Sequence, residues 1–147
     1  MRAFLITIIA SASISVATAH AQPATLTLAC KGTLTDKDID PPGTNRPISM
    51  NIMFNFTAGT VEFTNFLTEP AVRITAVNDL TVRFDGSRTQ SQYQTTISGS
   101  LDRVTGDMHM ALRVLRTPLQ IGGRVPETKV ESADDYELQC RPTQRMF

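Results

Sequence analysis

Few residues of this chain can perform acid–base or nucleophilic chemistry. Of its two histidines, His20 lies in an N-terminal segment that we expect to be removed, which leaves His109 on the outer face of a strand beside Asp107. A general base needs a nucleophile and an orienting partner within reach, and the sequence locates neither. We therefore expect a non-enzymatic protein without a cofactor. The alternative, a hydrolase with an unrecognised site, requires His109 to be buried beside an acid and a serine or threonine.

Three carboxylates at alternate positions, Asp36, Asp38 and Asp40, are spaced like the first ligands of a calcium-binding loop. The pattern then fails, because Pro41 stands where such a loop needs glycine and Pro47 where it needs a bidentate glutamate. We interpret the segment as a solvated turn, and weak calcium binding is the alternative.

Arginines supply the other candidates for binding. Arg46, Arg88 and Arg124 lie in or near expected loops, and an anion-binding rim formed by their guanidinium groups is the alternative to a solubilising role. Together with the three aspartates they make up the predicted binding residues. Other arginines fall on the outward parity of their strands and are expected to keep the sheet soluble: Arg73, Arg83 and Arg113.

The two cysteines, Cys30 and Cys140, lie far apart in the chain and on the apolar parity of their strands. An even cysteine count in an exported protein favours a disulfide, so neither thiol is expected to serve nucleophilic or zinc chemistry. Lipidation at Cys30 is the alternative, although Cys30 lies well past the apolar stretch of the N-terminal segment.

The N-terminal segment has the pattern of a secretory signal peptide. Arg2 provides a positive charge, residues 4–14 an apolar stretch, and Ala19-His20-Ala21 a cleavage site between small residues. We expect cleavage after Ala21, a mature chain of residues 22–147 forming one domain, and a periplasmic or secreted location. The 14 basic and 14 acidic residues of the full chain favour neither nucleic acid nor an anionic membrane as a partner. No second apolar run is long enough to span a bilayer, and we expect a monomer.

Strict alternation of apolar and polar residues predicts the strands that must position these candidate residues. Tyr93, Thr95, Ile97, Gly99 and Leu101 share one parity, and Met108, Met110, Leu112 and Val114 share another after residues 103–106. A short connection that ends in glycine predicts a hairpin. The predicted pairs, which place every apolar side chain on one face, are Leu101 with Met108, Gly99 with Met110 and Ile97 with Leu112.

Similar patterns predict about eight short strands in all, and no convincing helical stripe is present. The second strand should pair through Phe56 and Phe54 with Val61 and Phe63 of the third, and residues 85–87 should form a break. Tight turns between consecutive strands predict an all-β, antiparallel up-and-down meander, and a disulfide between the first and last strands favours a closed or nearly closed barrel. A β-sandwich is the alternative.

The meander places alternate connections at the same end. Three tight turns, at residues 58–59, 78–79 and 103–106, share one end, while the long loops 35–47 and 117–127 share the other. Long loops on a rigid scaffold are the usual place for binding. We therefore expect a binding or interaction module that acts through the long-loop end.

Two kinds of partner fit such a module. A small apolar ligand would need a hollow barrel, entered through the long-loop end, whereas a protein partner would dock on the loops. Bulky apolar residues on the inward parity favour a filled core and the protein partner. They are Leu26, Leu28, Ile48, Met50, Ile52, Phe54, Phe56, Val61, Phe63, Ile74, Val82, Phe84, Ile97, Leu101, Met108, Met110, Leu112, Val114 and Leu138.

Three motifs carry a resemblance: Cys30-Lys31-Gly32, Gly99-x-Leu101-Asp102-Arg103-Val104-Thr105-Gly106 and Tyr136-x-Leu138-x-Cys140. Together they resemble small uncharacterised exported β-proteins of Gram-negative bacteria, a resemblance that implies a periplasmic location and no particular activity. The layout is also loosely similar to that of periplasmic lysozyme inhibitors, which are small disulfide-closed β-barrels. Because their loop motif is absent here, that similarity implies architecture alone.

Overall fold

A computed structural model describes residues 24–37, 43–64, 70–117 and 128–143. These residues form eight antiparallel strands, each paired with its neighbour in the chain, and the first also pairs with the last to close a barrel. The predicted barrel is confirmed over the sandwich. The strands are β1 Thr25–Asp36, β2 Thr44–Asn55, β3 Thr60–Phe63, β4 Val72–Val77, β5 Thr81–Gln90, β6 Tyr93–Asp102, β7 Asp107–Arg116 and β8 Lys129–Pro142.

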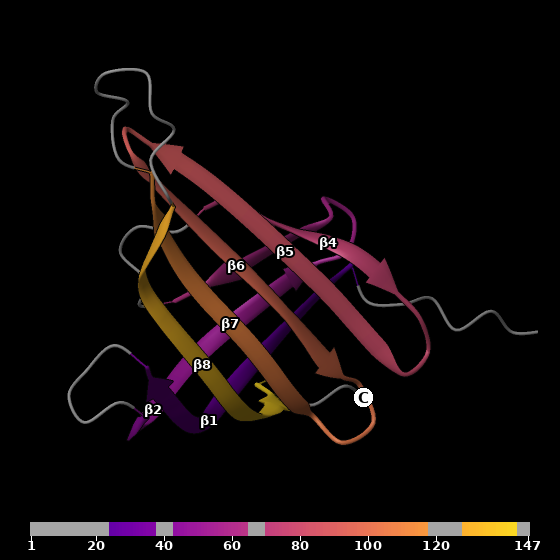
Figure 1. The fold of residues 1–147 in the computed structure, drawn as a ribbon. Helices are drawn as coiled ribbons and strands as arrows, with labels where there is room; N and C mark the ends of the chain where they lie inside the picture. The colour runs from indigo at the N-terminus through magenta and orange to yellow at the C-terminus, as the bar shows by residue number, and fades with distance from the viewer. Residues whose placement is uncertain (1–23, 38–42, 65–69, 118–127, 144–147) are drawn as a thin grey trace, which may run out of the picture.

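The barrel is flattened rather than round. In Figure 1 strands β5 to β8 run in front and cross over β1 and β2, which lie behind them. The tight turns β4–β5 and β6–β7 lie at the right of this view and the β5–β6 turn at the left, as the antiparallel strand order requires, so the predicted division into two ends is confirmed. Among the described residues there is no helix with the length and apolar character needed to cross a membrane.

A disulfide closes the seam between β1 and β8. Cys30 and Cys140 are direct cross-strand partners, and their sulfurs are bonded, as predicted. Both side chains belong to the core, and Cys140 Sγ lies 3.8 Å from Met108 Sδ. The covalent link therefore reinforces the one strand pair whose members are most distant in the chain.

The middle of the barrel is filled by its own side chains. Phe54 of β2 and Phe84 of β5 belong to strands that are not neighbours, yet their ring centroids lie 5.8 Å apart. Phe63 of β3 also approaches Phe84 to 5.8 Å. Aromatic rings from different walls thus meet across the interior at favourable edge and tilted geometries.

The β6–β7 hairpin has the predicted register, with Leu101 opposite Met108. Asp102 shapes its turn, because its carboxylate accepts hydrogen bonds from the backbone N–H groups of Val104 and Thr105. These hydrogen bonds hold the pKa of Asp102 below its usual value. Gly106 completes the turn with a φ of 80°, a conformation that favours glycine.

The predicted register between β2 and β3 is wrong by two residues. Phe54 pairs with Val61 and Ile52 with Phe63, whereas Phe56 already belongs to the turn. The turn therefore spans residues 56–59, and within it the Asn55 side-chain oxygen accepts a hydrogen bond from the backbone N–H of Ala58.

The predicted break at residues 85–87 is also wrong, because β5 continues through Gly86 to Gln90. Glycine is required there by a close approach rather than by a turn. A Cβ on Gly86 would lie 2.6 Å from the carbonyl oxygen of Ala71 and 3.0 Å from Val72 Cα. The chain reverses later, at Ser91, whose φ is 54°.

The loop predicted at residues 35–47 is shorter than expected. The β1–β2 ladder extends to the pair of Asp36 with Thr44, so only residues 37–43 connect the strands. Pro47 lies within β2, opposite Thr33. Proline is tolerated at this point because β3 pairs only with Ile52–Asn55, which leaves one side of β2 without a described partner strand near Pro47.

Candidate functional site

The inward faces of three strands change from apolar to charged at the long-loop end. On β1 the inward residue after Leu34 is Asp36, and on β8 the inward residue beyond Tyr136 is Asp134. Asp36 and Asp134 are cross-strand partners at the barrel seam. Arg46, on the inward parity of β2, lies 3.6 Å from the Asp36 carboxylate. The Asp36 side chain is only 13% exposed, so this ion pair is screened less than one on the open surface.

Tyr136 lies beneath this charged group and is itself buried. Burial and, to a smaller extent, the nearby carboxylate of Asp134 raise its pKa to about 12, while Arg46 opposes the shift. The phenol is therefore neutral over the physiological range.

A cavity is lined by the β5–β6 hairpin at the same end. Its volume is about 470 Å³, within the range of small-molecule and side-chain binding pockets. Two cross-strand pairs line it, Arg88 with Thr95 and Gln90 with Tyr93, together with the turn residues Ser91 and Gln92. The strand parity puts Arg88 and Tyr93 on the same side as the buried residues of their strands, so the cavity continues the barrel interior outward.

Arg116 fixes one wall of this cavity. Its guanidinium carbon lies 5.9 Å from the centroid of the Tyr93 ring, and its Nη1 lies 3.7 Å from the Glu131 carboxylate. A cation over an aromatic face at this distance holds the ring in place. Tyr93 nevertheless remains 40% exposed. Arg88, by contrast, has no carboxylate within ion-pair distance in the described part of the chain.

We refer to these two groups together as the mouth: Asp36, Arg46, Asp134 and Tyr136 on one side, and Arg88, Gln90, Tyr93, Thr95, Arg116 and Glu131 on the other. It offers guanidinium and amide donors, carboxylate acceptors and an accessible aromatic ring.

Of the six predicted binding residues, the structure places three at the mouth: Asp36, Arg46 and Arg88. Asp38, Asp40 and Arg124 lie outside the described residues, so calcium binding by the three aspartates stays a prediction. Most of the predicted loop 117–127 also lies outside them. Sequence reasoning missed several residues of the mouth: Tyr93, Arg116, Asp134 and Tyr136. The sequence does contain a signal for them. They occupy the same alternate positions as the inward-facing aliphatic residues of their strands, further along toward the strand ends.

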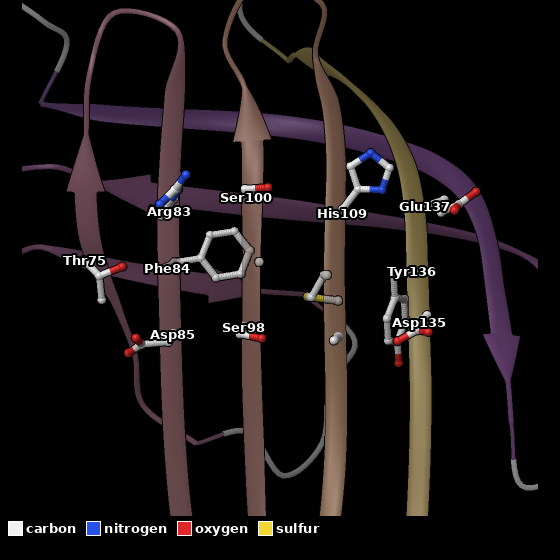
Figure 2. A pocket seen from close by; sticks show the side chains of 13 residues that line it. Thr75, Arg83, Phe84, Asp85, Ser98, Ser100, His109, Asp135, Tyr136 and Glu137 are labelled. Atoms are coloured by element: carbon white, nitrogen blue, oxygen red, sulfur yellow. The ribbon is translucent and has the colours of Figure 1, made fainter.

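His109 lies on the outer face, as predicted, and is exposed. Its cross-strand partners are Ser100 and Glu137, a serine and an acid. These three groups border a shallow outer hollow of about 580 Å³ (Figure 2), in which the Glu137 carboxylate points away from the His109 ring. Among the described residues no hydrogen bond joins the three side chains. The burial that a hydrolase site would require is therefore not met at His109.

Arg113, which was expected only to keep the sheet soluble, forms an ion pair on the outer face. Its guanidinium lies 2.6 Å from the Asp135 carboxylate and donates a further hydrogen bond to the carbonyl of Asp134, and Lys37 also pairs with Asp135. Hydrogen bonds from Lys37 and Arg113 hold the pKa of Asp135 below its usual value. This outer cluster links the end of β1 to β7 and β8, and so holds the strands that carry the mouth.

No protein-family model matches the chain, and comparisons with curated proteins and with solved structures found no match either.

Proposed function

We propose that this chain is an exported, non-enzymatic binding protein that recognises a protein partner with its mouth. The observation that carries the proposal is the change in the inward strand faces. They are apolar through the middle of the barrel, and they bear Asp36, Arg46 and Arg88 at the long-loop end.

The residue types at the mouth suit a protein interface. Arginine and tyrosine are over-represented among the residues that dominate binding energy. Arg88 is available for a partner's carboxylate, since no described acid pairs with it. The Tyr93 ring is held by Arg116 and remains accessible, so little side-chain freedom is lost when a partner packs against it.

An apolar ligand entering through this end is a weaker alternative. It would have to pass the charges of Asp36 and Arg46 and then displace the packed rings of Phe54 and Phe84. Burying apolar surface against charged groups gains little, because those groups must be desolvated.

Export is part of the same proposal. The signal-like segment at residues 1–21 and the Cys30–Cys140 disulfide both support an oxidising compartment, which we take to be the periplasm.

The test is native mass spectrometry of the protein purified from its own periplasm, in three forms. The wild type should carry a protein partner. A mouth variant with Arg46→Gln, Arg88→Gln and Tyr93→Ser should lose it, and a matched outer-face variant with Arg73→Gln and Arg83→Gln should keep it.

All three forms should unfold within about 1 kcal/mol of one another, because the replaced positions are exposed. Equal partner occupancy in the mouth and outer-face variants would reject the mouth as the recognition site. A retained small molecule in place of a protein would reject the proposed class of partner.

A further inference from the structure

A second cavity lies at the opposite end of the barrel, among the tight turns. Its volume is about 150 Å³, and its walls come from the start of β1, the end of β8 and the β6–β7 hairpin. Leu28, Leu101 and Cys140 are its buried lining residues. Leu26 and Phe56 are half-buried nearer the surface. We call this cavity the slot.

The slot is apolar for a structural reason. It is the end of the hydrophobic core, where inward positions are still occupied by leucine and phenylalanine, in contrast to the charged inward positions of the mouth. Its volume is similar to that of an engineered apolar cavity that takes up benzene, although the slot opens to solvent beside Asp102 and Arg103. The slot therefore has room for the end of one alkyl chain or for one ring.

One positively charged side chain borders the slot. Arg103 lines it, and one guanidinium nitrogen donates a hydrogen bond to the carbonyl of Asn78 in the β4–β5 turn. No described carboxylate pairs with Arg103, which leaves its remaining donors for an anion. The Asp102 carboxylate also lines the slot, where its Oδ1 accepts hydrogen bonds from the backbone N–H groups of Val104 and Thr105.

Two exposed apolar residues lie on the turns next to Arg103. Leu80 is 61% exposed and Val104 is 73% exposed. They lie on two turns that are joined by the hydrogen bond from the Arg103 backbone N–H to the carbonyl of Leu80.

We infer that the slot binds a single-chain amphiphile with a carboxylate head, its alkyl end among Leu26, Leu28 and Leu101 and its head at Arg103. This site is separate from the mouth, and the inference does not depend on the function proposed for that end.

The inference is tested by titrating hexanoate, octanoate and decanoate into the disulfide-bonded protein and following the methyl groups by NMR. Saturable shifts are expected at Leu26, Leu28 and Leu101. Affinity should rise about three- to fourfold with each added methylene until the slot is full, as expected for burial of a methylene group. Absent or non-saturating shifts, or shifts confined to residues of the mouth, overturn the inference.

Two variants and a neutral ligand test the two parts of the site. Arg103→Gln should weaken octanoate about two- to fivefold, as for an exposed ion pair, and leave 1-octanol unchanged. Leu26→Trp should abolish binding of both by filling the entrance, with the NMR fingerprint confirming the fold. Arg73→Gln, on the outer face of β4, is the matched control and should change neither. The inference is contradicted if Arg103→Gln lowers the affinities for octanoate and 1-octanol equally. It is also contradicted if Leu26→Trp leaves the binding of both unchanged.

Discussion

Replacing both cysteines by alanine should remove a large part of the protein's stability. The Cys30–Cys140 bond closes a loop of 110 residues, for which the chain-entropy relation gives about 5 kcal/mol at 25 °C. Alanine is the suitable replacement, since both sites are buried and a serine hydroxyl there would need a partner. The folded state should persist, because nine residue pairs from Leu28↔Pro142 to Asp36↔Asp134 still join β1 to β8.

Urea unfolding followed by circular dichroism measures this loss. With a slope of about 1–3 kcal/mol per molar urea, the midpoint of the double variant should fall by about 2–5 M. The slope should also rise, because the unfolded chain is no longer cross-linked and exposes more surface. Wild-type protein reduced before the titration is the control and should match the Cys30→Ala, Cys140→Ala variant.

A loss below about 1 kcal/mol, with the disulfide verified by mass, would refute the chain-entropy reasoning for this barrel. It would mean that the unfolded chain is already compact, or that the β1–β8 ladder persists after the rest of the barrel unfolds.

Three further predictions concern single sites. The free energy of unfolding should fall as pH rises from 10 toward 12, because the folded pKa of Tyr136 is raised to about 12 from 10 and the unfolded state releases its proton first. Phenolate absorbance in a Tyr93→Phe variant should therefore show a single transition near 12, and a transition near 10 would contradict the burial of Tyr136. Gly86→Ala should cost about 1–3 kcal/mol in urea unfolding, because its Cβ would meet the backbone of β4, and a neutral result would mean that β4 yields freely. Intact mass of the exported protein should correspond to a chain that begins at Gln22 and is two hydrogens lighter than its reduced form; a lipid on Cys30 would exclude this processing.

The parts of the fold that the sequence predicts correctly are those where alternation is strict. In the β6–β7 hairpin a slip of one residue would turn Met108 and Met110 to solvent, so only one register is compatible with the pattern. The disulfide was predictable for a related reason: Cys30 and Cys140 fall on the apolar parity of the first and last strands.

Glycine and proline account for much of what sequence reasoning missed. Gly86 and Pro47 were interpreted as signs of a break and a loop, yet both lie inside strands. The reason lies in tertiary structure: β4 passes close to Gly86, and β3 ends before it could pair alongside Pro47. Neither neighbour is visible in the local sequence.

The mouth was predicted in part, because its position at the long-loop end follows from the meander. Its composition was predicted only in part. Asp36, Arg46 and Arg88 were among the predicted binding residues, but Asp36 and Arg46 were assigned to a loop when they are inward-facing residues at strand ends. Extending the alternation beyond the aliphatic residues would have placed Tyr93 and Arg116 there as well.

The central claim, that the mouth is the recognition surface, is tested most directly by site-specific photo-crosslinking in the native periplasm. A photoreactive residue at Gln90, which is exposed and lines the mouth, is compared with one at Arg73 on the outer face of β4. We predict one discrete crosslinked protein from position 90 and none from position 73. The same product from both positions, or a product from position 73 alone, would contradict the claim.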